Sequence, residues 1–212
     1  MMKVVDLSRT ISNREEIYPG NPEIRIMRFR DHSEGCNISK IDFGSHSSTH
    51  VDVPLHHFID GMDTATMPLI VFMGNAVVLR VKLEENNIIS RDALKSEEIK
   101  EGDIVLISTG WEDKIGTRDY FYDYPYMSAE GAHFLIEKKV KCVGGDFPGF
   151  DSPEDENQPA HHLLLGKGIG LVEGLINLKG LSGQRFFFCA SPLKIEGSDG
   201  SPVRAFAILD FG

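Results

Sequence analysis

Short runs of β-branched and aromatic residues, separated by glycine and proline, make up most of the chain, and helical patterns are fewer. The runs predict strands at residues 4–7, 23–30, 38–43, 74–82, 104–109, 140–144, 169–173, 186–190 and 204–211. Helices are predicted at 91–100, 128–139 and 159–165, the first two with serine N-caps. No linker or repeat divides the chain, so we expect one α/β domain over residues 1–212. The strand spacing favours a mixed, curled sheet over a doubly wound parallel one.

The composition is that of an ordinary globular domain, with 212 residues, 41% hydrophobic, 25% charged and a formal net charge of −10. This acidic balance argues against a nucleic-acid partner or a polybasic membrane anchor, because both need a basic surface. The apolar stretch at 69–81 is too short and too interrupted to span a bilayer. Cys36, Cys142 and Cys189 are far apart, which is typical of reduced thiols in a cytoplasmic protein.

Histidine is unevenly distributed along the chain. Four of the eight histidines lie within twelve residues, and two more are adjacent at His161 and His162. In an extended strand alternate residues share a face, so His50 and Asp52 point the same way, and His46 joins them if the strand twists or bulges. Two imidazoles and a carboxylate on one face favour a zinc-type site. The alternative is a polar strand face turned to solvent or to a subunit interface.

The end of this strand is predicted at Pro54, because proline cannot donate to a strand ladder. By strand parity His56 then returns towards the polar face, whereas His57 points elsewhere. His56 is therefore the further histidine that we expect beside the cluster.

A second group of candidate ligands lies in the C-terminal third of the chain. Glu173 stands in an otherwise apolar run, and burial of its carboxylate is costly unless the group is paired or bound to a cation. His161 lies on the short predicted helix that precedes this run. The alternative is that Glu173 lies at the strand end and reaches water. The nucleophile motif G-x-S-x-G and the zinc motif H-E-x-x-H are both absent from the sequence.

Residues 46–56, His-Ser-Ser-Thr-His-Val-Asp-Val-Pro-Leu-His, resemble the H-x-G-T-H-x-D-x-P-x-H signature of the metal-dependent cyclase family. That family includes bacterial kynurenine formamidases and isatin hydrolases. The resemblance continues in Gly144-Gly-Asp146, in the spacing of His161 and Glu173, and in Ala190-Ser-Pro-Leu-Lys194. It implies a mixed sheet curled into a partial barrel with flanking helices, in homodimers or homotetramers.

The resemblance also implies roles for individual residues. His46, His50 and Asp52 correspond to ligands of a first divalent ion. His161 and Glu173 correspond to ligands of a second, with Asp52 and Glu173 able to bridge. The implied metal is zinc, with one or two ions bound, or manganese as in isatin hydrolases.

The remaining positions of the resemblance concern the reaction. His56 corresponds to the general acid or base. Tyr18 takes the place where kynurenine formamidases tend to carry a tryptophan that stacks on the substrate, and it keeps an aromatic platform there. Ser48 replaces the usual glycine of the signature.

The resemblance implies hydrolysis of a C–N amide bond in a small, aromatic substrate by metal-activated water. The model reaction is that of an arylformamidase in tryptophan catabolism, which converts N-formylkynurenine to kynurenine and formate. A hydrolase of cyclic amides or lactones like isatin hydrolase, or a cyclase, is the alternative in the same enzyme class. The alternative outside it is a protein that binds a metal or a small ligand without catalysis.

Overall fold

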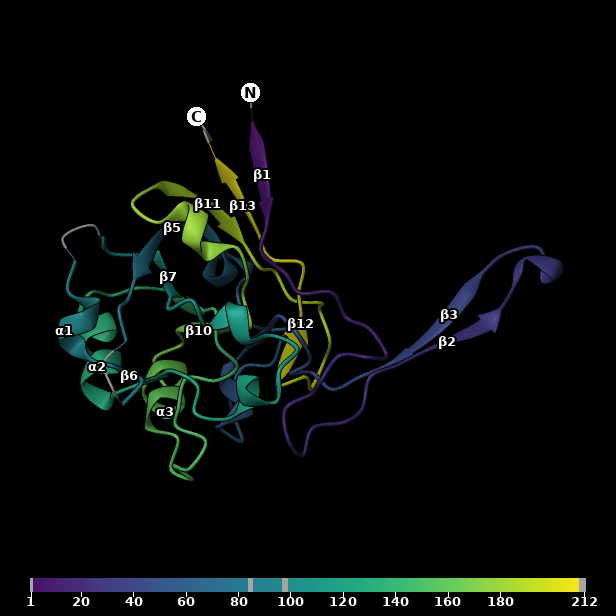
Figure 1. Ribbon diagram of the computed structural model, residues 1–212, viewed down its shortest axis with the longest axis horizontal. Coiled ribbons are helices and arrows are strands. Elements are labelled where there is room, and N and C mark those ends of the chain that lie inside the picture. The colour runs from purple at the N-terminus through teal and green to yellow at the C-terminus, as the bar shows by residue number, and fades with distance from the viewer. Residues whose placement is uncertain (1, 84–85, 97–98, 210–212) are drawn as a thin grey trace.

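The computed structural model describes residues 2–83, 86–96 and 99–209. Its main sheet has nine strands within this part of the chain (Figure 1). In spatial order they are β1 (Lys3–Asp6), β13 (Phe206–Leu209), β11 (Arg185–Cys189), β5 (Met73–Arg80), β7 (Ile104–Ser108), β9 (Cys142–Gly145), β10 (Gly170–Glu173), β4 (His50–Asp52) and β12 (Gly200–Pro202). Strands β5, β7, β9 and β10 are parallel and the other neighbours antiparallel. The expectation of a mixed sheet is confirmed.

The sheet must curl because of how its two edges are connected. Strand β12 is the outermost strand at one edge, and β13, next to the other edge, begins at Phe206 only four residues after Pro202. Four residues span at most about 14 Å, whereas seven strand spacings in a flat sheet would span about 34 Å. A bridge between Ser8, just after β1, and Leu175, just after β10, also joins distant parts of the sheet. The predicted partial barrel is therefore confirmed.

In the described ranges three α-helices cover one face of the sheet: α1 (Arg91–Leu94), α2 (Ala129–Glu137) and α3 (Pro159–Leu165). The hydroxyls of Ser90 and Ser128 cap the first two, as predicted, by accepting the backbone N–H of Ala93 and Gly131. Helix α3 has the predicted bounds. Helix α1 ends at Leu94 and not at residue 100, because Lys95 leaves the helical backbone conformation with ψ of 116°. Residues 97–98 of that prediction lie outside the described residues.

Strand side chains alternate between two apolar layers, so both faces of the central sheet are buried. Val77 and Leu79 of β5 pack in the layer beneath the helices. Ala76 and Val78 of the same strand pack in the layer that the curled sheet encloses. This burial on both faces explains why the central strands read as continuous apolar runs in the sequence.

A two-stranded hairpin, β2 (Arg25–Arg30) and β3 (Ile38–Asp42), projects from the body of the protein (Figure 1). Both strands were predicted, but they form a sheet of their own. The hairpin exposes large apolar side chains, among them Phe29 at 70% and Ile41 at 57%.

The remaining elements are short. A parallel pair, β6 (Ile88–Ile89) and β8 (Tyr126–Met127), was not predicted, nor was β12, because two or three residues carry no periodic signal. The 3₁₀ helices are His32–Glu34, Pro54–His56, Leu69–Phe72, Trp111–Lys114, Arg118–Phe121 and Leu178–Leu181. Residues 210–211 of the last predicted strand lie outside the described residues. No helix in the described ranges is long and apolar enough to cross a membrane.

Candidate metal centre

The histidine–aspartate segment folds into a short strand preceded by a tight turn. Strand β4 starts at His50, because Ser48 adopts a left-handed backbone conformation with φ of 62°. The turn brings His46 back over the strand, with its Nδ1 2.7 Å from Asp52 Oδ1. This turn supplies the distortion that His46 needs to join His50 and Asp52. The strand ends before Pro54, as predicted.

Strand pairing brings the second group of candidate ligands to the first. Strand β10 runs antiparallel to β4 with Glu173 directly opposite His50, so their side chains share a face. Glu173 Oε2 lies 3.3 Å from His50 Nε2. From helix α3, His161 Nε2 lies 3.3 Å from Glu173 Oε1 and 3.7 Å from Asp52 Oδ2. The structure thus brings together all five side chains that the sequence suggested as metal ligands.

The five side chains form two overlapping groups that share Asp52. One group is His46, His50 and Asp52, and the other is Asp52, His161 and Glu173. Within each group the potential ligand atoms lie within 4.8 Å of one another. Asp52 directs Oδ1 towards the first group and Oδ2 towards the second, so a single carboxylate can serve both.

Buried atoms without hydrogen-bond partners show that a divalent ion fits here. His50 Nε2, Asp52 Oδ2 and Glu173 Oε1 are buried and have no hydrogen-bond partner. Unsatisfied polar atoms are costly in a protein interior, and three of them converge on one place. Imidazole nitrogen and carboxylate oxygen form the donor set that zinc and similar divalent ions take.

The other ring nitrogen of each candidate histidine ligand faces an acceptor. His50 Nδ1 lies 3.1 Å from the backbone oxygen of Ser48, and His161 Nδ1 lies 2.6 Å from Asp151 Oδ2. With Nδ1–H donating, Nε2 of both rings is left to face the carboxylates. Such acceptors fix the ring orientation of histidines that bind metals.

The electrostatics of the cluster favour a cation. Burial opposes protonation of His46, but the carboxylates of Asp52 and Asp199 raise its pKa to about 10. Burial opposes ionisation of Asp52, yet the neighbouring imidazoles hold its pKa well below the usual value. Asp52 and Glu173 are only 1% and 5% exposed, and a carboxylate oxygen of each lies within 4.8 Å of one of the other, so the pair needs positive charge beside it. A bound metal ion supplies that charge and lets the histidines remain neutral.

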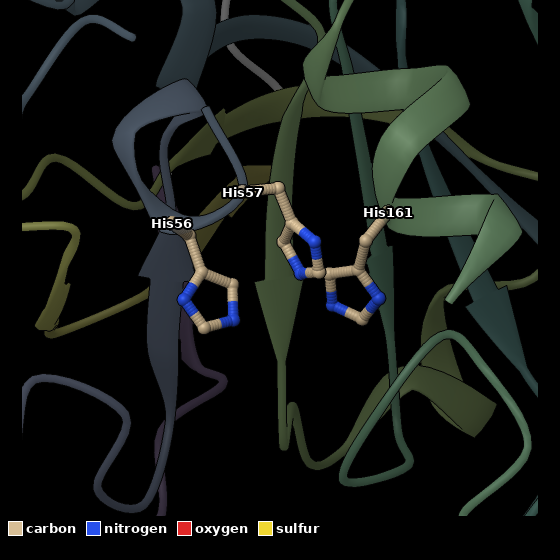
Figure 2. Close-up of side chains that lie close together, drawn as sticks. All are labelled: His56, His57 and His161. Atoms are coloured by element: carbon tan, nitrogen blue, oxygen red, sulfur yellow. The ribbon is translucent and has the colours of Figure 1, made fainter. Parts of the chain in front are cut away.

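The structure corrects the predicted orientation of His57. Residues Pro54–His56 form a 3₁₀ turn, so the alternation of an extended strand does not apply beyond the proline. The His57 ring lies between His56 and His161 and stacks on the latter, with ring centroids 5.0 Å apart (Figure 2). Burial and the neighbouring histidines lower the pKa of His57 to about 4, so this ring stays neutral at pH 7.

A cavity of about 220 Å³ opens onto the cluster. Among the residues that line it are His50, His56 and Tyr18. Phe121 and Tyr124 extend its aromatic wall, and the Tyr124 hydroxyl lies 3.1 Å from that of Tyr18. Because pockets for drug-sized ligands measure about 300–1,000 Å³, this cavity is suited to a small molecule.

The structure places at the site several residues whose role the sequence does not indicate. Asp151, at the start of an acidic loop, accepts the Nδ1–H of His161 and the backbone N–H of Ala160 at the start of α3. Asp199 lies in a polar turn and contacts His46 and His56. Tyr124 lies in the aromatic run of residues 120–126. Only the folded chain brings these residues to the ligands.

Comparisons with known proteins agree with the fold. Residues 5–152 match the model of the Cyclase family, described as "Putative cyclase". A kynurenine formamidase of Salinibacter ruber is 31% identical over 96% of both chains. A solved structure described as a potential metal-dependent hydrolase with cyclase activity is 29% identical, with a TM-score of 0.83 over 98% of both chains. Isatin hydrolase A from Ralstonia solanacearum is 25% identical, with a TM-score of 0.83 over 99% of this chain and 92% of that one.

The curled sheet, the buried histidine–carboxylate cluster and these similarities define an enzyme of the metal-dependent hydrolase class. Within that class, the chain belongs to the Cyclase family.

The left-handed turn at Ser48 yields a prediction about stability. A non-glycine residue in this conformation costs about 1–2 kcal/mol, and part of that cost is regained when glycine replaces it. We expect Ser48→Gly to raise the free energy of unfolding by about 0.5–1 kcal/mol in urea titrations. Ser48→Ala removes a buried hydroxyl that has no hydrogen-bond partner but keeps the strained Cβ, so its gain should be smaller than that of Ser48→Gly. An equal gain in both variants would contradict the explanation by backbone strain.

Proposed function

We propose that the protein hydrolyses the C–N amide bond of small aryl formamides, with N-formylkynurenine as the model substrate. The observation that carries this proposal is the pair of ligand groups sharing Asp52 at the base of a small, aromatic-walled cavity. The kynurenine formamidase that is 31% identical over nearly the whole chain supports the choice of a formamide. The products are formate and an aromatic amine.

The proposed metal ligands are His46, His50 and Asp52 for one divalent ion and Asp52, His161 and Glu173 for a second. Zinc suits this nitrogen and oxygen set, and manganese is the alternative. When bound, a divalent ion lowers the pKa of a coordinated water to about 7 and polarises a carbonyl oxygen.

His56 is the proposed general base and acid. It lines the cavity, and its Nδ1 faces Asp199 Oδ2 at 3.3 Å, which leaves Nε2 as the nitrogen that can take a proton. In amide hydrolysis the attacking water loses a proton and the leaving amine gains one. A single imidazole beside the reacting bond can accept the first proton and return it to the nitrogen.

Tyr18, Phe121 and Tyr124 are the proposed contacts for the aromatic ring of the substrate. Tyr18 packs edge-on against Phe121 at 5.8 Å and against Tyr124 at 6.3 Å, so the three rings form one wall. Such a wall buries a flat ring and excludes water from the reacting carbonyl. Burial and the Tyr18 hydroxyl raise the pKa of Tyr124, so its hydroxyl stays protonated.

There are two alternatives to hydrolysis of an aryl formamide. A cyclic amide such as isatin presents the same kind of bond on a fused ring, and the similarity to isatin hydrolase A makes it the second candidate substrate. A protein that only binds a metal or a small ligand would have no use for His56 beside the ligands.

The proposal includes an oligomeric state and a cellular location. Met27, Phe29, Ile38 and Ile41 expose apolar surface on the projecting hairpin, and a second copy of the chain would bury it in a homodimer or homotetramer. A cytoplasmic location is supported by three cysteines that form no disulfide in the structure.

Replacement of His56 tests the reaction. We expect His56→Ala to lower kcat for N-formylkynurenine about 10²- to 10⁴-fold, because the proton carrier is lost, while metal content stays unchanged. Formate release from N-formylkynurenine and formanilide, ring opening of isatin, and metal content are all measured on the same preparation. His133→Ala, an exposed histidine on α2, is the matched control. Full activity of His56→Ala with metal bound would rule out the assigned role.

The proposed role of the hairpin in oligomer assembly is tested by light scattering during gel filtration. Phe29→Asp and Ile41→Asp place charge on the exposed apolar surface, so we expect each to shift the protein towards the monomer. Ser39→Asp adds the same charge on the same hairpin without removing an apolar side chain, and it should assemble like the parent chain. A parent chain that is monomeric at micromolar concentration would contradict the proposed assembly.

A further inference from the structure

One carboxylate oxygen contacts both His46 and His56. Asp199 Oδ2 lies 2.9 Å from His46 Nε2 and 3.3 Å from His56 Nδ1. The two imidazole rings lie close together, with centroids 4.1 Å apart and an angle of 35° between their planes. A carboxylate oxygen has two lone pairs, so it can accept an N–H from each ring. A proposed metal ligand and the proposed general base therefore share one acceptor.

The position of Asp199 is fixed by contacts on several sides. Its other oxygen, Oδ1, accepts the hydroxyl of Ser45 at 2.8 Å. Its backbone oxygen accepts the N–H of Val53 at 3.2 Å. The next residue, Gly200, begins β12 directly opposite Asp52 of β4. A Cβ on Gly200 would lie 2.9 Å from His46 Cε1, so the glycine is needed for this close approach. The carboxylate is held in place and is not a side chain that happens to lie nearby.

We propose that Asp199 is a positioning residue that sets which ring nitrogen His46 gives to the metal and which one His56 presents to the substrate. By accepting Nε2–H of His46, Asp199 leaves Nδ1, the atom 2.7 Å from Asp52 Oδ1, as the metal ligand. By accepting Nδ1–H of His56, it leaves Nε2 free to carry the proton of the reaction. The second half of this assignment rests on the proposed function.

The arrangement of His46 is the reverse of that of the other two histidine ligands. His50 and His161 donate Nδ1–H and direct Nε2 to the carboxylates, whereas His46 directs Nδ1 there and donates Nε2–H. The turn at Ser48 places the ring of His46 in this opposite orientation, so it needs an acceptor of its own. Asp199 is that acceptor. Asp199 does not line the substrate cavity, so it acts through the two histidines and not on the substrate.

The first test reads the tautomers directly by ¹⁵N NMR of zinc-loaded protein labelled at histidine. For the parent chain we expect His56 to carry its proton on Nδ1 and His46 on Nε2. In Asp199→Asn the amide keeps the shape but offers one acceptor oxygen, so at least one of the two rings should change tautomer or become a mixture. Asp199→Glu restores a carboxylate and should recover part of the parent pattern. Asp60→Asn, at an exposed acidic residue, is the control for the change in charge.

The second test separates metal binding from chemistry. We expect Asp199→Asn to weaken zinc binding about 10- to 100-fold in competition with a chelator, as is usual when the acceptor behind a histidine ligand is lost. At saturating zinc, kcat for N-formylkynurenine should still fall at least 10-fold, while KM stays within about twofold. A merely structural defect would change KM or the unfolding temperature instead.

Parent tautomers and parent zinc affinity in Asp199→Asn would overturn the proposal. So would a further zinc ion that is bound by the parent chain and lost in Asp199→Asn, because His46, His56 and Asp199 would then be ligands of an additional ion and not a hydrogen-bonded group. If the parent chain hydrolyses no amide while the variants change tautomers and affinity as expected, the proposed function fails and the role of Asp199 towards His46 stands.

Discussion

The site is governed by the electrostatic cost of burying two carboxylates close together. Asp52 and Glu173 lie on adjacent strands whose register sets Glu173 opposite His50, and both are nearly inaccessible to solvent. Like charges at this depth are tolerated only with compensating positive charge. The surrounding histidines supply it as protons, and divalent ions supply it better because they also satisfy the buried atoms that have no partners. The ligand arrangement, the charge of the site and its proposed chemistry all follow from this requirement.

The curl of the sheet makes this arrangement possible. Strand β12 pairs with β4 and places Asp199 beside His46, although the two residues are 153 positions apart. Parallel pairing of β9 and β10 brings the loop that carries Asp151 towards the start of α3, which carries His161. Each candidate ligand therefore lies on a strand, a capped helix or a turn tied to the sheet. Sites built on such elements hold their geometry more accurately than sites on long loops.

Several candidate ligands could be identified from the sequence because they follow local rules. His50 and Asp52 share a strand face, and Glu173 stands out in an apolar run. The orientation of His57 could not be predicted, because Pro54 starts a 3₁₀ turn in which strand alternation no longer holds. Asp199 could not be found either, because an aspartate in a polar turn is ordinary and its partners are more than 140 residues away. In the fold, continuous apolar runs identified the central strands. Strands β6 and β8, which pair with each other, are too short to show a hydrophobic period.

The claim that the buried cluster is a metal centre is tested most directly by counting the ions bound. Elemental analysis of protein equilibrated with zinc should find two ions per chain in the parent and one in Glu173→Gln, which leaves the group of His46, His50 and Asp52 intact. Asp52→Asn removes a charged ligand from both groups and should retain neither ion at the same free zinc concentration. Two ions retained in Asp52→Asn, or none bound by the parent chain, would contradict the account.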